Sequence, residues 1–238
     1  MTPHKYHHEF EVLKQIYALY DETIKDQKMV CKKGCAACCT CNVTLTGLEA
    51  AYLSQALDTE AKAALKDAVD RHFPQKRYIP KITTNQFARL CMEGHAVPEE
   101  ENNPEWGTCP ALNTSLCSIY HARPFGCRAL MSTIVCADHG YARVRPEIIT
   151  TNTLFMQAIE HLDQNGISGN FSDIMSLFLG KNSLSKSEEN SIDHIRKKIT
   201  TKENFQFTAN EKITVLMIEP EYRNKLSVVI QILSSFLK

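Results

Sequence analysis

The chain has 238 residues, of which 43% are hydrophobic and 23% are charged, so it has the composition of a folded globular protein and enough length to bury a hydrophobic core. Its 27 basic and 27 acidic residues balance, which argues against nucleic acid or an anionic membrane surface as a partner. The N-terminus lacks the apolar core of a secretory signal, and no apolar stretch reaches the ~20 residues of a membrane span, so we expect a cytoplasmic protein.

Two helices are predicted from the N-terminal third of the chain. Apolar residues from Phe10 to Ile24 recur at helical spacing and predict a helix that ends before the first cysteine. Thr46 and Glu49 then form a predicted capping box, which opens a second helix that runs through Leu57. Both segments are expected to pack their apolar faces inward.

The middle of the chain alternates between helix and irregular structure. Asp58 can cap a helix that extends to about Phe73, and a short helical pattern spans residues 87–91. Residues 97–107 are acidic and contain Asn and Pro, which predicts a surface loop. Residues 109–139 have no sustained period, so their structure should depend on bound metal rather than on helix or strand hydrogen bonds.

The helical period returns at Asn152 and continues toward the C-terminus. Residues 213–218 are compatible with either a buried strand or the start of a helix. The other predicted segments are a short helix over residues 171–179, a linker over residues 181–186, a capped helix from Ser187, and a final helix from Pro220.

We therefore predict a mostly α fold in which helices scaffold an irregular, cysteine-rich metal-binding core. Residues 1–150 should form an N-terminal helix and a metal-binding module. Residues 151–238 should form a helical extension that packs on this module within one structural domain.

Ten cysteines are the unusual feature of the composition. Because the cytosol keeps thiols reduced, metal binding or redox chemistry is the leading interpretation, rather than disulfides. Cys35 and Cys38 form a C-x-x-C unit whose sulfurs can face the same side of a tight turn, as in zinc knuckles and iron–sulfur loops. Gly34 suits such a turn because glycine tolerates positive φ. Five cysteines lie within eleven residues: Cys31, Cys35, Cys38, Cys39 and Cys41.

A second group of cysteines lies about seventy residues further along the chain and can supply ligands from a distant segment. Four thiolates around Zn²⁺ or a [4Fe–4S]²⁺ core leave about two net negative charges, which Arg123, Arg128 and the pair Lys32 and Lys33 are placed to offset. The predicted metal ligands are Cys31, Cys35, Cys38, Cys39, Cys109, Cys117 and Cys127.

The remaining candidates stay open or are set aside. Cys41 and Cys136 are each open between ligand and bystander, whereas Cys91 is predicted to be a small buried apolar residue without a role. Either His121 or His139 would be able to replace a thiolate, although an exposed or core-satisfied histidine is commoner. A thioredoxin-type pair would need a βαβ unit, and the sequence before the C-x-x-C unit predicts helix and turn instead.

The number of cysteines leaves the type of centre open. Seven or eight candidates exceed the four ligands of one tetrahedral zinc site, so either an iron–sulfur cluster or two zinc ions would account for them. We prefer a [4Fe–4S] cluster to zinc. Cys38 and Cys39 are adjacent and point in different directions on most backbones, so we expect one to ligate while the other packs or binds a second metal.

Four motifs span about residues 31–136 and are Cys31-Lys-Lys-Gly-Cys35-Ala-Ala-Cys38-Cys39, Leu45-Thr46-x-x-Glu49-Ala50, Cys109-Pro110-Ala-Leu112 and Cys117-Ser-Ile-Tyr120-x-x-Arg123-Pro124-x-x-Cys127-Arg128. In these motifs the chain resembles the YkgJ-type cysteine-cluster family, which is described as zinc- or iron-chelating. The family's paired-cysteine block reads C-x-x-C-x-x-C-C, whereas the first gap here is one residue longer.

The resemblance implies a metal-binding module, and related domains occur in flagellin lysine methylases, where an iron–sulfur cluster is implied. No G-x-G-x-x-G motif for a methyl donor follows a strand in this chain. Two functions therefore remain: an iron–sulfur protein with an electron-transfer or protein-modifying role, or a non-enzymatic zinc-binding structural or metal-handling module. The expected partners are a metal ion or cluster and a protein, without nucleic acid or membrane.

Overall fold

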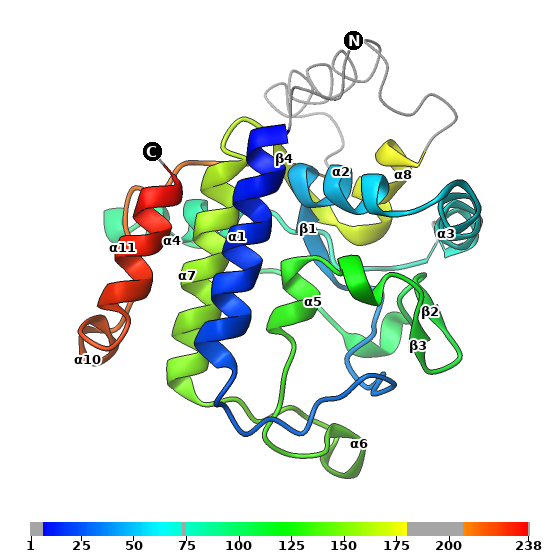
Figure 1. The fold of residues 1–238 in the computed structure, drawn as a ribbon, viewed down its shortest axis with the longest axis horizontal. Coiled ribbons are helices and arrows are strands. Elements are labelled where there is room, and N and C mark those ends of the chain that lie inside the picture. The colour runs from blue at the N-terminus through cyan, green and yellow to red at the C-terminus, as the bar shows by residue number, and fades with distance from the viewer. Residues whose placement is uncertain (1–6, 73–74, 180–206, 238) are drawn as a thin grey trace.

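The computed structural model describes residues 7–72, 75–179 and 207–237 and has the mostly helical architecture that the sequence predicts (Figure 1). The predicted linker over residues 181–186 and the predicted helix from Ser187 lie outside the described residues. Of the helices that the structure describes, none combines the length and the apolar character needed to cross a membrane. The α-helices are α1 (His7–Ile24), α2 (Gly47–Ala56), α3 (Thr59–His72), α4 (Thr84–Glu93), α5 (Phe125–Ala129), α6 (Cys136–His139), α7 (Pro146–Leu162), α8 (Phe171–Phe178), α10 (Pro220–Arg223) and α11 (Ser227–Phe236), with short 3₁₀ turns at Pro104–Trp106 and Tyr120–Ala122.

The local capping signals in the first half of the chain are confirmed. The Glu49 backbone N–H donates to Thr46 Oγ1 at 3.1 Å, and the Thr46 N–H donates to Glu49 Oε2 at 2.9 Å, so the predicted capping box opens α2. The Ala61 N–H donates to Asp58 Oδ1 at 2.8 Å at the start of α3. These bonds satisfy N–H groups that the first turn of a helix leaves without an intrahelical partner.

Two helices begin earlier than their hydrophobic period predicts. The structure starts α4 at Thr84, behind a second capping box formed by Thr83 and Gln86. It starts α7 at Pro146 instead of Asn152, because a proline at the first helical position has the φ angle that the helix needs and lacks only an N–H group that would be unpaired there.

Residues 213–218 form neither the strand nor the helix that we considered. They run as an irregular, half-buried segment whose backbone bonds to side chains of α7. The Ile213 N–H donates to His161 Nδ1 at 3.2 Å, and the Met217 N–H donates to Gln157 Oε1 at 2.9 Å. These side chains replace the backbone partners of a regular element. The predicted final helix does begin at Pro220, but it divides into α10 and α11.

A three-stranded antiparallel sheet lies among the helices and was not predicted. Its strand order is β1-β4-β5, formed by β1 (Thr44–Thr46), β4 (Ile167–Asn170) and β5 (Phe207–Ala209). Strands of three or four residues are too short to produce a recognisable alternation in the sequence. A separate hairpin pairs β2 (Leu112–Asn113) with β3 (Leu116–Cys117).

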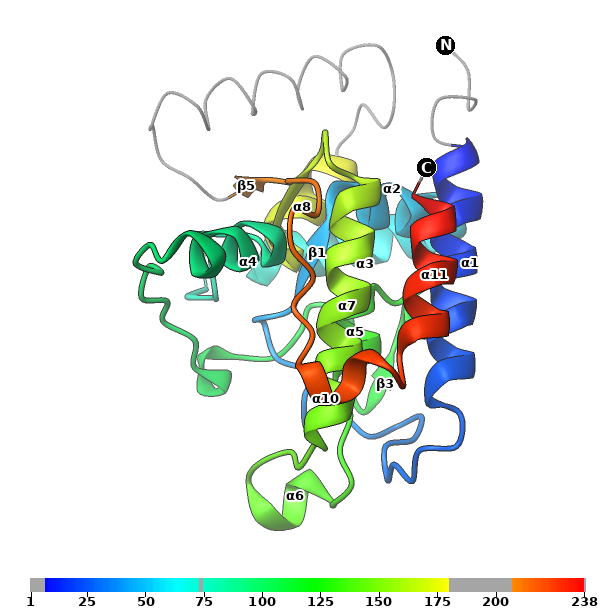
Figure 2. The same ribbon diagram turned by 90° about the vertical axis from the view of Figure 1, so that its left-hand side faces the viewer.

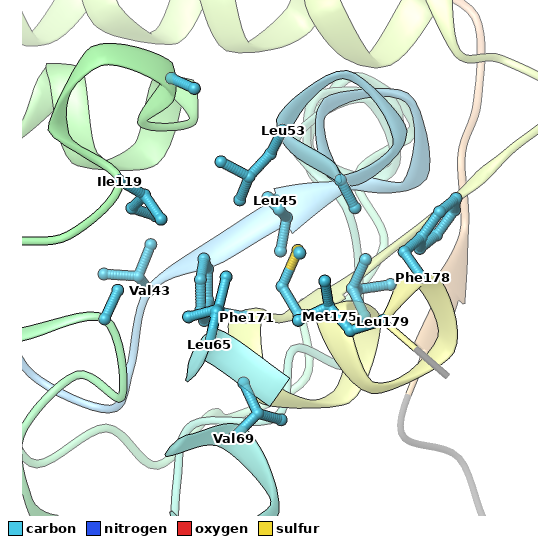
Figure 3. Close-up of a cluster of buried hydrophobic side chains, with 14 of the residues drawn as sticks. Val43, Leu45, Leu53, Leu65, Val69, Ile119, Phe171, Met175, Phe178 and Leu179 are labelled. Atoms are coloured by element: carbon cyan, nitrogen blue, oxygen red, sulfur yellow. The ribbon is translucent and has the colours of Figure 1, made fainter. Parts of the chain in front are cut away.

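The core consists of two clusters of buried side chains. The sheet cluster packs β1 and β4 against α2, α3 and α8, and Figure 3 shows its main residues, with Val43 and Ile119 next to each other at one edge. The helix cluster packs α1 against α7 and α11 (Figures 1 and 2). The Tyr20 ring lies 4.7 Å from the Phe125 ring and 5.1 Å from the Phe155 ring, with edge-to-face geometry in both pairs.

Candidate metal centre

One cavity of about 210 Å³ brings all seven predicted ligand cysteines to its wall. Arg123 and Arg128 also line it. The wall is formed by the loop after α1, the β2–β3 hairpin and α5, which lie in the lower half of Figure 1. Val43 and Ile119 line it too, so the edge of the sheet cluster seen in Figure 3 forms part of the wall.

Backbone hydrogen bonds join the two cysteine-bearing segments. The Cys109 N–H donates to the Cys39 carbonyl at 2.9 Å, and the Cys41 N–H donates to the Gly107 carbonyl at 2.9 Å. These bonds hold two segments that are far apart in sequence side by side without the help of a metal. The protein therefore supplies part of the arrangement that we predicted to depend on bound metal.

The turn before the C-x-x-C unit has the predicted backbone conformation. Gly34 adopts φ = +91°, and the Cys35 N–H donates to the Lys32 carbonyl at 3.0 Å to close the turn. No atom lies within 4 Å of the position that a Cβ would occupy at Gly34. The positive φ, and not lack of space, is therefore what favours glycine here.

Four of the seven thiols form an inner set that packs on the sheet cluster. Cys109 is buried within that cluster, and Cys39, Cys117 and Cys127 are half-buried against it. Burial raises the pKa of Cys109 to about 11. Burial, followed by the nearby Cys109 and Cys117 thiols, also raises the pKa of Cys127. Cys109 and Cys127 are therefore stable in the neutral form until a cation compensates their charge.

The raised pKa of Cys109 predicts how the stability of the metal-free protein depends on pH. A thiol titrates near pH 9 in the unfolded chain but near pH 11 in the folded protein, so the folded state binds more protons between these values. Stability should be highest below about pH 9 and fall by roughly 2–3 kcal/mol as pH approaches 11. Denaturant unfolding in the presence of a chelator across this range measures the effect. A free energy of unfolding that stays constant or rises would contradict it.

The other three thiols lie at the solvent side of the cavity. Cys31 and Cys35 are exposed, and Cys38 is half-buried. The pKa of Cys31 is raised by its partial burial and further by the neighbouring Cys35, Cys38 and Cys136 thiols. Cys38 donates its S–H to Cys39, which raises the pKa of Cys38 and lowers that of Cys39. The adjacent pair thus joins the inner set to the outer thiols.

The two arginines on the cavity wall have different surroundings. The Arg123 guanidinium lies 4.5 Å from the centre of the Tyr120 ring, and its charge acts to lower the pKa of Cys117 and Cys127, although burial outweighs it at both. Arg128 lies 4.2 Å from the centre of the Tyr17 ring and bonds to the Arg123 carbonyl at 3.1 Å. Arg123 is therefore the cation placed to offset thiolate charge, whereas Arg128 holds α5 against α1.

This difference predicts unequal effects on metal affinity. Replacing Arg123 by Gln should weaken binding by about 10-fold or more, with the Lys variant in between, because Lys keeps the charge but loses the planar donor fork. Replacing Arg128 by Gln should weaken binding less. Competition titration with a chelator measures each affinity. Equal metal affinities for the wild type and the Arg123 variants would show that the Arg123 charge does not stabilise the metal centre.

The remaining candidates lie away from the cavity wall. Cys41 is buried, and its thiol donates to the Lys76 carbonyl at 3.6 Å. His121 and His139 are both exposed and do not line the cavity. Cys91 is exposed, so the prediction that it is buried was wrong. It lies near the end of α4 that extends away from the rest of the protein in Figure 2.

Two residues that organise the site, Ser132 and Glu49, were not predicted to do so from the sequence. Ser132 is completely buried, its carbonyl accepts the Val30 N–H at 3.0 Å, and its hydroxyl accepts the Ile134 N–H at 3.1 Å. Nothing in the sequence distinguishes this serine. Glu49 was recognised only as a helix cap, but it also accepts the Phe125 N–H at 2.6 Å at the start of α5, the helix that carries a cysteine of the inner set.

A second cavity, of about 140 Å³, contains no cysteine and is lined in part by Glu49 and Glu160. Burial raises the pKa of Glu160. Its carboxyl oxygens accept the Asn85 N–H at 2.8 Å and the Glu211 N–H at 2.9 Å, which ties α4 and the segment after β5 to α7. Both carboxyl groups therefore hold the fold together.

The donor set of the cysteine cavity suits a soft metal centre. Thiolates are the ligands of zinc and of iron–sulfur clusters, and the cavity wall contains no aspartate, glutamate or histidine among the described residues. Within the described ranges, no three Cys, His, Asp or Glu side chains already stand together as a complete ligand group. Binding would require the thiols on the wall to rotate toward the centre and lose their protons.

Comparison with known proteins agrees with this donor set. A model of the CxxCxxCC family, described as "Putative zinc- or iron-chelating domain", matches residues 30–157, which include both cysteine segments and most of α7. No curated protein and no solved structure matches the chain. With more than half of its 238 residues matched, the chain belongs to the CxxCxxCC family of zinc- or iron-chelating domains.

Proposed function

We propose that this protein holds a [4Fe–4S] cluster in the cysteine cavity, bound by Cys39, Cys109, Cys117 and Cys127, and exchanges electrons with a protein partner. The observation that carries the proposal is that seven thiols line one cavity whose inner part is the edge of a hydrophobic cluster. When bound, the cluster would supply reversible one-electron transfer.

The size of the cavity and the number of thiols favour a cluster over one zinc ion. Zinc takes four thiolates at about 2.3 Å, so its ligands must crowd around a single point. A [4Fe–4S] core takes its four cysteines around a larger body. The inner thiols come from three separate segments around a cavity of about 210 Å³, and a cavity of this volume suits the larger body better.

The residues of the chain have distinct tasks in this proposal. The hydrophobic cluster and Ile119 exclude water from the inner thiols, and Arg123 supplies a positive charge beside them. The exposed Cys31 and Cys35 mark the solvent side of the cavity, from which a protein partner would approach. A cluster near the surface is within reach of an electron donor or acceptor.

The test is to purify the full chain anaerobically and to measure iron, sulfide and zinc per chain. We expect about four irons and four sulfides, with broad absorbance near ~400 nm that dithionite bleaches. Cys109→Ser should lose this absorbance, whereas the exposed Cys91→Ser should keep it. A colourless protein that holds only zinc would overturn the cluster and favour the zinc-binding structural or metal-handling module.

A further inference from the structure

Cys136 lies close to Cys31, one of the three thiols that line the cavity and that the proposed cluster does not use, although it comes from a different segment of the chain. It is the first residue of α6, more than ninety positions after Cys38. Cys35, Cys38 and Cys136 are the thiols close enough to Cys31 to raise its pKa. These four cysteines are called the outer set.

The segment around Ser132 holds the two ends of the outer set together. The Val30 N–H donates to the Ser132 carbonyl at 3.0 Å, and the Cys31 thiol points to the same carbonyl at 4.0 Å. The Cys136 thiol donates to the Ile134 carbonyl at 3.9 Å. The Ser132 hydroxyl donates to that carbonyl as well, at 2.8 Å. Two thiols from distant parts of the sequence thus bond to carbonyls two residues apart.

Packing against the sheet cluster distinguishes the inner set from the outer set. All four inner cysteines belong to the sheet cluster or pack against it, whereas no cysteine of the outer set does so among the described residues. The two sets touch at Cys38 and Cys39, whose side chains share a hydrogen bond. Cys38 therefore belongs to the outer set, although its neighbour Cys39 belongs to the inner set.

We propose that Cys31, Cys35, Cys38 and Cys136 form a second metal position, distinct from the cluster, that binds one zinc ion through four thiolates. Four cysteines, three of them within eight residues of one loop, match the ligand number and spacing of a structural zinc site. Lys32 and Lys33 lie in the same loop and would offset the two net negative charges of such a site. This position goes beyond the proposed function, since it requires no iron.

A zinc ion here would connect the loop after α1 to α6 and close the solvent side of the cavity. Both elements lie at the same end of the molecule in Figures 1 and 2. The two sets use different cysteines, and a hydrogen bond between the Cys38 and Cys39 side chains joins them. Zinc affinity and cluster content should therefore respond to different cysteines.

The experiment compares four full-length proteins purified anaerobically: the wild type, Cys136→Ser, Cys109→Ser and the control Cys91→Ser. Iron and zinc are measured per chain, and Co²⁺ is substituted for zinc because its visible spectrum reports tetrahedral thiolate coordination. We expect Cys136→Ser to lose one zinc per chain and the cobalt spectrum while it keeps its iron. Cys109→Ser should lose iron and keep one zinc.

Cys31→Ser serves as a second outer variant and should match Cys136→Ser if the two residues share a metal. A zinc content in Cys136→Ser equal to that of Cys91→Ser would overturn the second position and leave the cluster intact. If a folded Cys136→Ser protein loses both iron and zinc, all the cysteines serve a single metal centre, and the second metal position is overturned as well. Two zinc ions without iron, one lost in each variant, would support the second position and reject the cluster.

Discussion

Replacing Cys127 by Ser should abolish cluster binding and produce the largest loss of stability of any single cysteine substitution. A hydroxyl is a poor ligand for a soft metal centre, and a centre that joins distant segments contributes its binding energy to folding. Cys127 lies on α5, which also packs on the helix cluster through Phe125. The expected loss is roughly 3 kcal/mol or more. Metal content and denaturant unfolding with and without chelator measure both effects.

Cys41→Ser is the matched control for this prediction. Cys41 is as buried as an inner cysteine, but its thiol points to the Lys76 carbonyl and does not line the cavity. We expect this variant to lose about 1 kcal/mol through altered packing and to retain its metal. If Cys127→Ser and Cys41→Ser have the same metal content, the inner set is assigned incorrectly.

Replacing Glu49 by Ala should destabilise the protein by roughly 3–5 kcal/mol, because several buried donors would lose their acceptor together. Glu49 is 3% exposed and accepts the Tyr17 hydroxyl at 2.8 Å and the Phe125 N–H at 2.6 Å. It also accepts the Thr46 N–H at 2.9 Å. One side chain thus joins α1, α2 and α5.

The Glu49 variant should also bind metal more weakly, since the lost bond to Phe125 frees the start of the helix that carries Cys127. Glu49→Gln keeps an acceptor oxygen and should have an intermediate stability. The exposed Glu60 in the first turn of α3 is the control, and Glu60→Ala should change stability by less than about 0.5 kcal/mol. Chelator competition and thermal unfolding separate the two effects. If the Glu49→Ala protein is as stable as the Glu60→Ala protein, Glu49 acts only as a cap of α2 and does not join the three helices.

The sequence alone predicted the features that depend on neighbours along the chain. A helix cap is formed by residues three positions apart, which is why the Thr46–Glu49 box and the Asp58 cap were found. The turn at Gly34 is local in the same sense. A cysteine thiol is a ligand for soft metals in any fold, so the clustered cysteines predicted metal binding before any geometry was known.

Only the tertiary structure decided which groups meet across the fold. The three-stranded sheet pairs β1 with β4, whose strands are too short to leave a pattern, and residues 213–218 satisfy their backbone through Gln157 and His161. The second bond of Glu49, the separation of Arg123 from Arg128, and the nearness of Cys136 to Cys31 all join residues remote in sequence. Their positions follow from how the two hydrophobic clusters pack, and burial depends on the whole chain and not on any local run of residues.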